Sequence, residues 1–224
     1  YALNLGSNYR LRYRYNGNVS LGFSRLRTGD PRYAEAGQFS ETRDFRFRWT
    51  HRQDAKARPD LRLNADVNFA TSSYYRNNST NPEDVLQNSF RSSVNMVKTW
   101  QGTPFTLNAA IRHQQNNGQQ TFSMDLPEVA FAMNRIQPFQ GNGVGEEKWY
   151  ERISLVYNLD SKMEVRDSLS AYEDISRLSE ANRIRIGANN RVGVTWNARI
   201  FKHFTITPSL NYNAAFLPQR YSYR

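Results

Sequence analysis

The chain contains no cysteine, which excludes disulfide bonds and thiolate metal sites within these residues. It also lacks a long hydrophobic run. The longest, Val129–Met133, is far shorter than the roughly 18 residues that a membrane-spanning helix needs, so we exclude a helical membrane protein. Only 38% of the 224 residues are hydrophobic. That share is small for the closed core of a soluble protein of this length.

What the sequence does have is a sustained alternation of apolar and polar residues. The clearest example runs from Val192 to Phe216 and predicts two strands around a turn at Lys202 and His203. Soluble strands usually stop at about five or six residues, whereas strands that cross a bilayer at a tilt need roughly nine to eleven. These arms reach that length, so the stretch predicts a transmembrane β-hairpin. Pro208 predicts a local irregularity in it, because proline cannot donate a ladder hydrogen bond.

The same alternation recurs along the chain and predicts about ten antiparallel strands. Asn16–Gly17 is a two-residue hairpin signal, and Arg27–Glu41 and Ser72–Gln87 are typical of long polar loops. The apolar parity flips at Pro127–Glu128, which predicts a β-bulge. Ser161–Arg183 has helical spacing and a capping-box pattern, so it predicts a short helix within a long loop.

A lipid-facing apolar surface around a polar lumen reconciles long alternating strands with low hydrophobicity. The predicted fold class is therefore all-β, an antiparallel transmembrane β-barrel. Short and long connections broadly alternate, and outer-membrane barrels have short periplasmic turns and long extracellular loops. This orientation puts both chain ends outside the cell, whereas a complete barrel normally starts and ends in the periplasm. We expect residues 1–224 to be a single domain and an internal portion of a larger barrel, incomplete at both ends. The alternative is a complete ten-stranded barrel.

The arginines fall largely on the parity opposite to the apolar residues, so we expect them to face the lumen. On the lipid face an arginine would cost roughly 2 to 4 kcal/mol at the bilayer midplane. Each one could simply fill a polar lumen beside Asp44 or Asp66, while together they could attract a phosphorylated sugar or an acidic plug. The expected basic wall consists of Arg10, Arg12, Arg14, Arg46, Arg48, Arg62, Arg91, Arg112, Arg185, Arg191 and Arg199. The positions expected to face lipid are Phe45, Phe47, Trp49, Val194, Trp196, Ile206 and Leu210.

Catalytic and metal sites find little support in the sequence. The glycine-rich Gly141–Gly145 lacks the Lys-Ser/Thr pair and the following helix of a phosphate-binding loop. His51, His113 and His203 are isolated and have no metal-ligand spacing. His113 and Ser123 lie on facing strands, as a polar lumen would arrange by chance. We expect no enzyme, no cofactor and no metal.

The sequence between Thr121 and Phe216 carries segments that resemble a known family. They are FSMDLPEVAF from Phe122, NRIQPF from Asn134, and the stretch from Gly187 into HFTITPSLNY at His203–Tyr212. They resemble the barrel of the lipopolysaccharide-assembly outer-membrane protein family LptD, in its Bacteroidetes-type form.

That resemblance implies a very large barrel in the outer membrane of a Gram-negative bacterium. It implies delivery of lipopolysaccharide from a periplasmic bridge to the outer leaflet, with an LptE-like lipoprotein plug inside the barrel. The family's jelly-roll domain and gate strands are not recognisable in this sequence. The disulfides of some members have no cysteine to match here.

Two other function classes remain as alternatives. One is another large outer-membrane barrel, such as a TonB-dependent transporter or a porin. The other is a soluble basic all-β protein that binds nucleic acid, which the net charge of +10 would suggest. The basic residues are spread over many strands and do not surround a base-stacking platform, so we expect no nucleic-acid partner. The expected partners are membrane lipid, lipopolysaccharide, the plug lipoprotein and the periplasmic bridge proteins.

Overall fold

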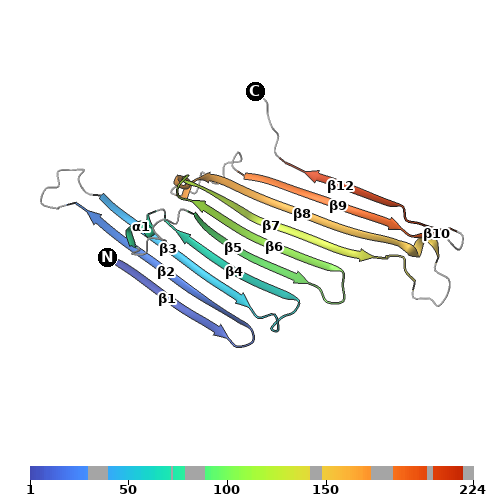
Figure 1. Cartoon of the computed structure of the whole chain (residues 1–224), viewed down its shortest axis with the longest axis horizontal. Coiled ribbons are helices and arrows are strands. Elements are labelled where there is room, and N and C mark those ends of the chain that lie inside the picture. Colours follow the sequence, from blue (N-terminus) through green and yellow to red (C-terminus); the bar gives the residue numbers. More distant parts are fainter. Residues whose placement is uncertain are drawn as a thin grey trace, which may run out of the picture.

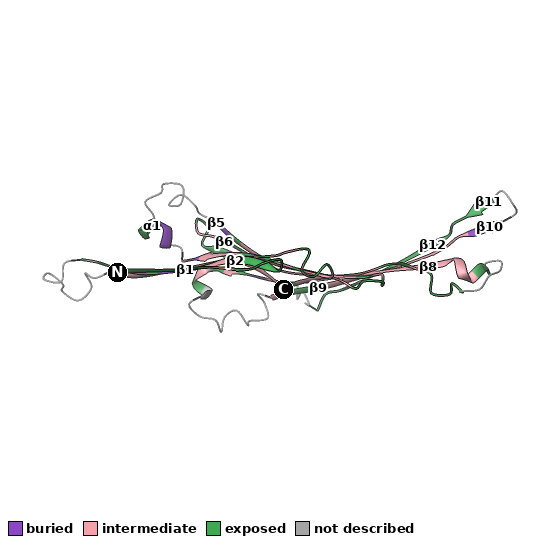
Figure 2. Ribbon diagram, turned by 90° about the horizontal axis from the view of Figure 1, so that it is seen from below, coloured by how far each residue is buried: buried purple, intermediate pink, exposed green. Residues whose placement is uncertain are grey.

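The computed structural model is dominated by one antiparallel sheet of ten strands. It describes residues 1–29, 40–71, 73–78, 89–141, 148–172, 184–200 and 204–218. The strands lie side by side in chain order, from β1 at one edge to β12 at the other (Figure 1). Seen edge-on, they form a single layer (Figure 2). The described sheet is open, because its edge strands β1 and β12 do not pair with each other.

The strands of the main sheet are long, as the alternation predicts. They are β1 (Ala2–Leu11), β2 (Tyr15–Thr28), β3 (Ser40–Gln53), β4 (Leu61–Ala70), β5 (Ser89–Thr99), β6 (Phe105–Asn116), β7 (Thr121–Ile136), β8 (Ile153–Ser168), β9 (Ile184–Trp196) and β12 (Ser209–Phe216). Two short strands, β10 (Ala198–Ile200) and β11 (Phe204–Ile206), pair separately. The helical elements are α1 (Tyr74–Asn78) and two 3-10 turns, Trp149–Arg152 and Leu169–Tyr172. In the described part of the chain, no helix is long and apolar enough to cross a membrane.

The register sorts the side chains onto two faces, because paired residues of antiparallel strands project to the same side. Pairs such as Leu21 with Phe47 define the apolar face, and their neighbours, such as Ser20 with Arg48, define the polar face. The separation continues across the sheet. Further apolar-face pairs are Trp49–Val67, Ala65–Val94, Val94–Ile111, Leu107–Phe131, Phe131–Leu159, Leu155–Val194 and Leu210–Val194.

Two predicted irregularities are confirmed. The register between β6 and β7 shifts between Ala110 and Arg112, and that between β7 and β8 shifts between Asp125 and Glu128. This is the β-bulge at Pro127, and it keeps apolar residues on one face on both sides of the proline. The second irregularity is at Pro208, where β11 has ended and β12 has not begun.

Several local predictions were wrong. Asn16–Gly17 lies within β2, opposite Arg10 and Tyr9, and the hairpin turn falls instead at residues 12–14, with Tyr13 at a φ of 62°. The loop predicted at Arg27–Glu41 is shorter, because Arg27 and Glu41 still pair in the β2–β3 ladder.

The helix predicted at Ser161–Arg183 is also corrected. β8 continues to Ser168, since Met163 and Val165 prolong its apolar alternation, and it is followed by the single 3-10 turn Leu169–Tyr172. The remainder of that prediction, 173–183, lies outside the described residues, as does the predicted turn at Lys202 and His203.

Within β2, Gly17 has a packing role, because the ring of Tyr9 lies across it. The Tyr9 hydroxyl lies 2.8 Å from Nδ1 of His51 and accepts a hydrogen bond from Nε1 of Trp49 at 2.9 Å. A Cβ on Gly17 would collide with the Tyr9 ring and with the backbone oxygen of Thr50. The glycine therefore allows a cluster of polar aromatic side chains to form on the apolar face, near the short-turn end of the strands.

We expect Gly17→Ala to lower the free energy of unfolding by about 1–3 kcal/mol, the usual cost of overpacking. Urea unfolding of the full-length protein in detergent would measure the loss. Gly6→Ala is the matched control in the adjacent strand, since a Cβ there meets nothing within 4 Å. Equal stability of the two variants would show that the Tyr9 ring moves aside without cost.

Candidate functional site

Most of the predicted basic wall lies on the polar face. Eight of the eleven arginines are in strands of the main sheet with polar-face register: Arg10, Arg46, Arg48, Arg62, Arg91, Arg112, Arg185 and Arg191. Arg12 and Arg14 are in the β1–β2 turn and not on a strand, because the turn replaces the strand that the parity predicted there. The Arg12 guanidinium lies 4.9 Å from the centre of the Tyr13 ring. Arg199 is in β10, outside the main sheet, and its side chain is outside the described part.

The residues predicted to face lipid lie on the opposite side. Phe45, Phe47, Trp49, Val194, Trp196 and Leu210 all have apolar-face register. Ile206 is in β11, which pairs only with β10, so it is not part of the main apolar face. Phe90, which shares the parity of Val94 in β5, is an exception. Its ring is only 1% exposed and stacks on Tyr75 of α1 at a centroid distance of 5.3 Å.

Most charges on the polar face of β6–β9 are paired with an opposite charge. Arg112 forms an ion pair with Glu128, and Arg191 forms one with Asp160. Lys162 pairs with Asp125 at 3.0 Å, and Arg166 pairs with its strand neighbour Glu164. Lys162 and Arg166 were not among the predicted wall residues. The cross-strand partner of Lys162 could not be identified before the register was known.

The polar face of β1–β5 is different, because its arginines exceed its carboxylates. We call this set the basic surface: Arg10, Arg46, Arg48, Arg52, Arg62 and Arg91. The described part of the chain gives none of them an ion pair. The carboxylates on this face are Asp44 and Asp66. Arg52, opposite Asn64, was missed in the sequence although it continues the parity of Arg46 and Arg48.

Asp44 does not neutralise the basic surface, because its carboxylate holds α1. It is completely buried and accepts hydrogen bonds from Ser73 Oγ, from Thr71 Oγ1 at 3.2 Å and from Asn77 Nδ2 at 2.9 Å. The predicted loop after β4 therefore begins with a helical turn laid on the polar face. In Figure 2, α1 stands off the sheet on one side.

The two tyrosines of α1 complete this contact. Tyr74 and Tyr75 are 7% and 8% exposed. The Tyr74 hydroxyl donates to Oδ1 of Asn4 at 3.1 Å, and Gly22 leaves room for it where any Cβ would collide. The Tyr75 ring centre lies 5.2 Å from the Arg46 guanidinium, and Arg46 Nε is buried with no hydrogen-bond partner among the described residues. A hollow of about 370 Å³ opens here between α1 and the polar side of β1–β3.

The structure does not assemble the catalytic arrangements considered from the sequence. His113 pairs with Met124 on the apolar face, where its ring lies between Phe69 and Phe122. Ser123 pairs with Gln114 and has polar-face register, opposite to that of His113. Ser123 and His113 are therefore not arranged as a nucleophile and its base. Most of Gly141–Gly145, and all of His203, lie outside the described residues. Within the described part, no group of three or more potential metal ligands comes together.

The comparisons with known proteins add one positive finding. The family model described as LptD protein matches residues 1–224, the whole of this sequence. No curated protein matches the chain. The match favours the expectation from the resemblance over a TonB-dependent transporter or a porin. The ten-stranded antiparallel sheet, apolar on one face and polar on the other, fits the wall of an outer-membrane barrel. The chain therefore belongs to the LptD family, and its role is in the transport and assembly of lipopolysaccharide at the outer membrane.

Proposed function

We propose that this chain forms part of the barrel wall of a lipopolysaccharide translocon in the bacterial outer membrane. The apolar face contacts membrane lipid, and the polar face lines the lumen. The basic surface on β1–β5 is the part that the phosphorylated sugars of lipopolysaccharide meet. Lipopolysaccharide is the cargo, and the proposed protein partners are an LptE-like plug lipoprotein in the lumen and the periplasmic bridge proteins that deliver the cargo.

The observation that carries this proposal is the separation of apolar from polar side chains, which recurs in each pair of neighbouring strands from β1 to β12. If this single-layer sheet were soluble, its whole apolar face would be exposed to water. Many of its large side chains are indeed uncovered, among them Leu3, Leu5, Phe23, Ile111 and Leu210. An exposed apolar patch of this extent indicates a lipid or protein interface. A bilayer covers such a face and leaves the polar face wet.

The basic surface supports the choice of cargo. Guanidinium groups remain charged at physiological pH and can hold a phosphate through two parallel hydrogen bonds. Each contact in a wet lumen is weak, near the roughly 0 to 1 kcal/mol of a screened pair. Several weak contacts favour occupancy by an anionic sugar without trapping it, and transport requires both.

Single cysteines test the assignment of the faces, because the segment has none of its own. Cysteines at Phe47 and Val194 should react with a lipid-soluble maleimide in intact outer membranes. Cysteines at the adjacent Arg48 and Thr195 should react with a water-soluble one, since their register is that of the polar face. Mass-spectrometric quantification of labelling would measure both reactions.

Each strand supplies its own control, because the two cysteine positions are adjacent residues. They lie at nearly the same depth, and their side chains point to opposite faces. Proteins unfolded in urea should react equally at all positions. A reversed pattern in membranes would invalidate the assignment of lumen and lipid. Equal reaction with the water-soluble reagent at all four sites would indicate that the sheet does not lie in a membrane.

A further inference from the structure

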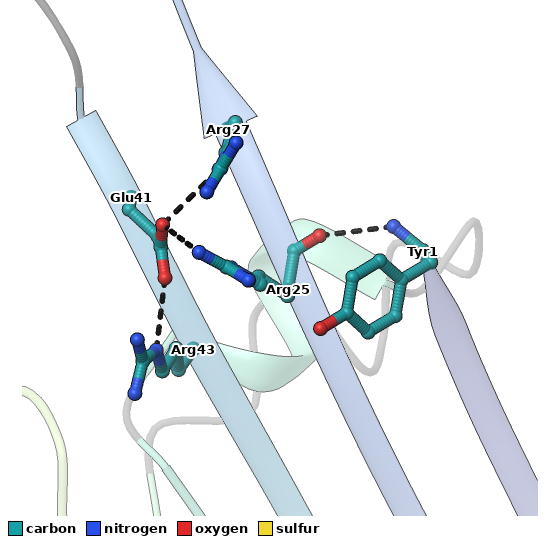
Figure 3. Close-up of polar contacts among 5 residues, drawn as sticks. All are labelled: Tyr1, Arg25, Arg27, Glu41 and Arg43. Atoms are coloured by element: carbon teal, nitrogen blue, oxygen red, sulfur yellow. Dashed lines mark hydrogen bonds and ion pairs between the residues drawn. The ribbon is translucent and has the colours of Figure 1, made fainter.

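Three arginines share one glutamate on the apolar-face side of β2 and β3 (Figure 3). Oε2 of Glu41 accepts hydrogen bonds from Arg25 and, at 3.1 Å, from Arg27 Nε, while Oε1 accepts one from Arg43 Nε at 2.9 Å. We call these four residues the arginine cluster. It carries two more positive charges than negative ones. Such a surplus on the apolar-face side needs an explanation.

The register places the arginine cluster directly beyond the apolar band. Phe23 pairs with Phe45, the next pair on the same face is Arg25 with Arg43, and the next is Arg27 with Glu41. At about 3.4 Å per residue, the first of these pairs lies roughly 7 Å past the phenylalanines along the strand. The apolar band of an outer-membrane barrel is flanked by aromatic residues at its interfaces. The arginine cluster therefore lies at headgroup height, outside the membrane-spanning part of the strands.

The end of the strands that carries the arginine cluster is the one with the long β2–β3 and β4–β5 connections. In outer-membrane barrels the long connections are extracellular. The apolar face at this level therefore meets the headgroups of the outer leaflet. This step rests on the proposed function, because it uses the proposed orientation of the sheet.

The arginine cluster is built so that two guanidinium groups remain available. Arg25 is the most covered, with a side-chain exposure of 25%, whereas Arg27 and Arg43 are 64% and 69% exposed. Both bind Glu41 through Nε, and the described residues offer no acceptor to their terminal nitrogens. The Arg25 guanidinium lowers the pKa of Glu41 to about 2, with help from Arg43 and Arg27, so the carboxylate is ionised at neutral pH. Glu41 thus fixes two guanidinium groups whose terminal nitrogens have no acceptor among the described residues.

We propose that Arg27 and Arg43, held in place by Glu41 and Arg25, bind the phosphate groups of lipopolysaccharide from the outer leaflet, on the membrane side of the barrel wall. This site is distinct from the lumen. The fork of a guanidinium matches a phosphate, and the neighbouring Phe23 and Phe45 offer apolar contact to the acyl chains below it. The site would hold lipid that has already been delivered around the barrel.

The test measures equilibrium binding of lipid A to the purified full-length complex in mixed micelles. The Arg27→Gln/Arg43→Gln variant should bind phosphorylated lipid A about tenfold more weakly at this site, since two charge-assisted contacts are lost. Its binding of dephosphorylated lipid A with the same acyl chains should equal that of the wild type. The Arg27→Lys/Arg43→Lys variant should lie between the two, because lysine keeps the charge and loses the planar fork.

Lys56→Gln/Arg58→Gln is the matched control. It removes the same charge from the β3–β4 turn, at the opposite end of the strands. It should bind like the wild type, and all variants should show the same heat-dependent shift in electrophoretic mobility, which reports a folded barrel.

Wild-type binding by the glutamine variant, or an equal loss in the Lys56/Arg58 control, would overturn the proposal. So would binding of dephosphorylated lipid A to the wild type as tightly as phosphorylated lipid A. Displacement by phosphatidylglycerol or inorganic phosphate at the concentration of lipid A would show a general anion site and overturn the assignment to lipopolysaccharide. The proposed function is judged separately, by delivery of lipopolysaccharide to the surface of cells, so either proposal can fail alone.

Discussion

Replacing Arg10, Arg48, Arg62 and Arg91 together by glutamine should slow the delivery of lipopolysaccharide to the cell surface by about fivefold. These four residues belong to the basic surface, and the described part of the chain gives them no ion pair. Each contributes only a screened contact, so Arg48→Ala alone should be nearly silent. The loss appears when several contacts along one path are removed, because occupancy depends on their sum. Pulse-labelled lipopolysaccharide at the surface measures the rate.

A charge-neutral control exists on the other half of the polar face. Arg112→Gln with Glu128→Gln, and Arg191→Gln with Asp160→Asn, remove two complete ion pairs by the same number of substitutions. This variant should deliver lipopolysaccharide at close to the wild-type rate. If the quadruple arginine variant also assembles, keeps its plug and exports at that rate, the basic surface is only lumen filler and its proposed contact with the cargo is wrong.

The difference between the halves of the polar face could not be predicted from the sequence. Parity places Arg48 and Arg191 on the same face equally well. Which arginine has a carboxylate opposite it depends on the register between strands. That register is set by turn positions and bulges, which parity within one strand does not fix.

The features that were predicted correctly have signals within a single strand. The alternation gives the strands their two faces, and the flip at Pro127 marks the bulge because a shift of one residue exchanges the faces. The β1–β2 turn shows the limit of such signals. Asn16–Gly17 matches a hairpin turn locally, yet Gly17 is needed for the ring of Tyr9, a contact between strands.

The arginine cluster and α1 also depend on contacts between residues far apart in the sequence, which patterns within one strand do not reveal. Arg27 and Glu41 were predicted to bound a polar loop, yet they pair in the β2–β3 ladder, where Glu41 also binds Arg25. The one turn of α1 has no helical periodicity long enough to detect. It depends on Asp44, which is 29 residues or more from its partners Ser73, Asn77 and Asn78 in the sequence.

Asp44→Ala should release α1 from the polar face and lower the free energy of unfolding by about 2–4 kcal/mol, because the buried carboxylate is the shared acceptor for donors of Thr71, Ser73 and Asn77. Hydrogen exchange should increase at Asn77, whose backbone N–H donates to Ser73, and urea unfolding in detergent gives the free energy. Asp66→Ala is the control, since that carboxylate is exposed on the same face.

The release of α1 should also be seen at the basic surface. The Tyr75 ring covers the Arg46 guanidinium at 5.2 Å. If α1 is released, this guanidinium becomes exposed to the lumen. Arg46→Cys should therefore react with a water-soluble maleimide faster in the Asp44→Ala background than with Asp44 present. The control Arg48→Cys should react equally in both, since no contact joins Arg48 to α1 among the described residues. Unchanged reaction at residue 46 together with unchanged exchange at Asn77 would mean that the tyrosine contacts hold the helix without the carboxylate. Asp44 would then have no part in deciding which arginines the cargo can reach.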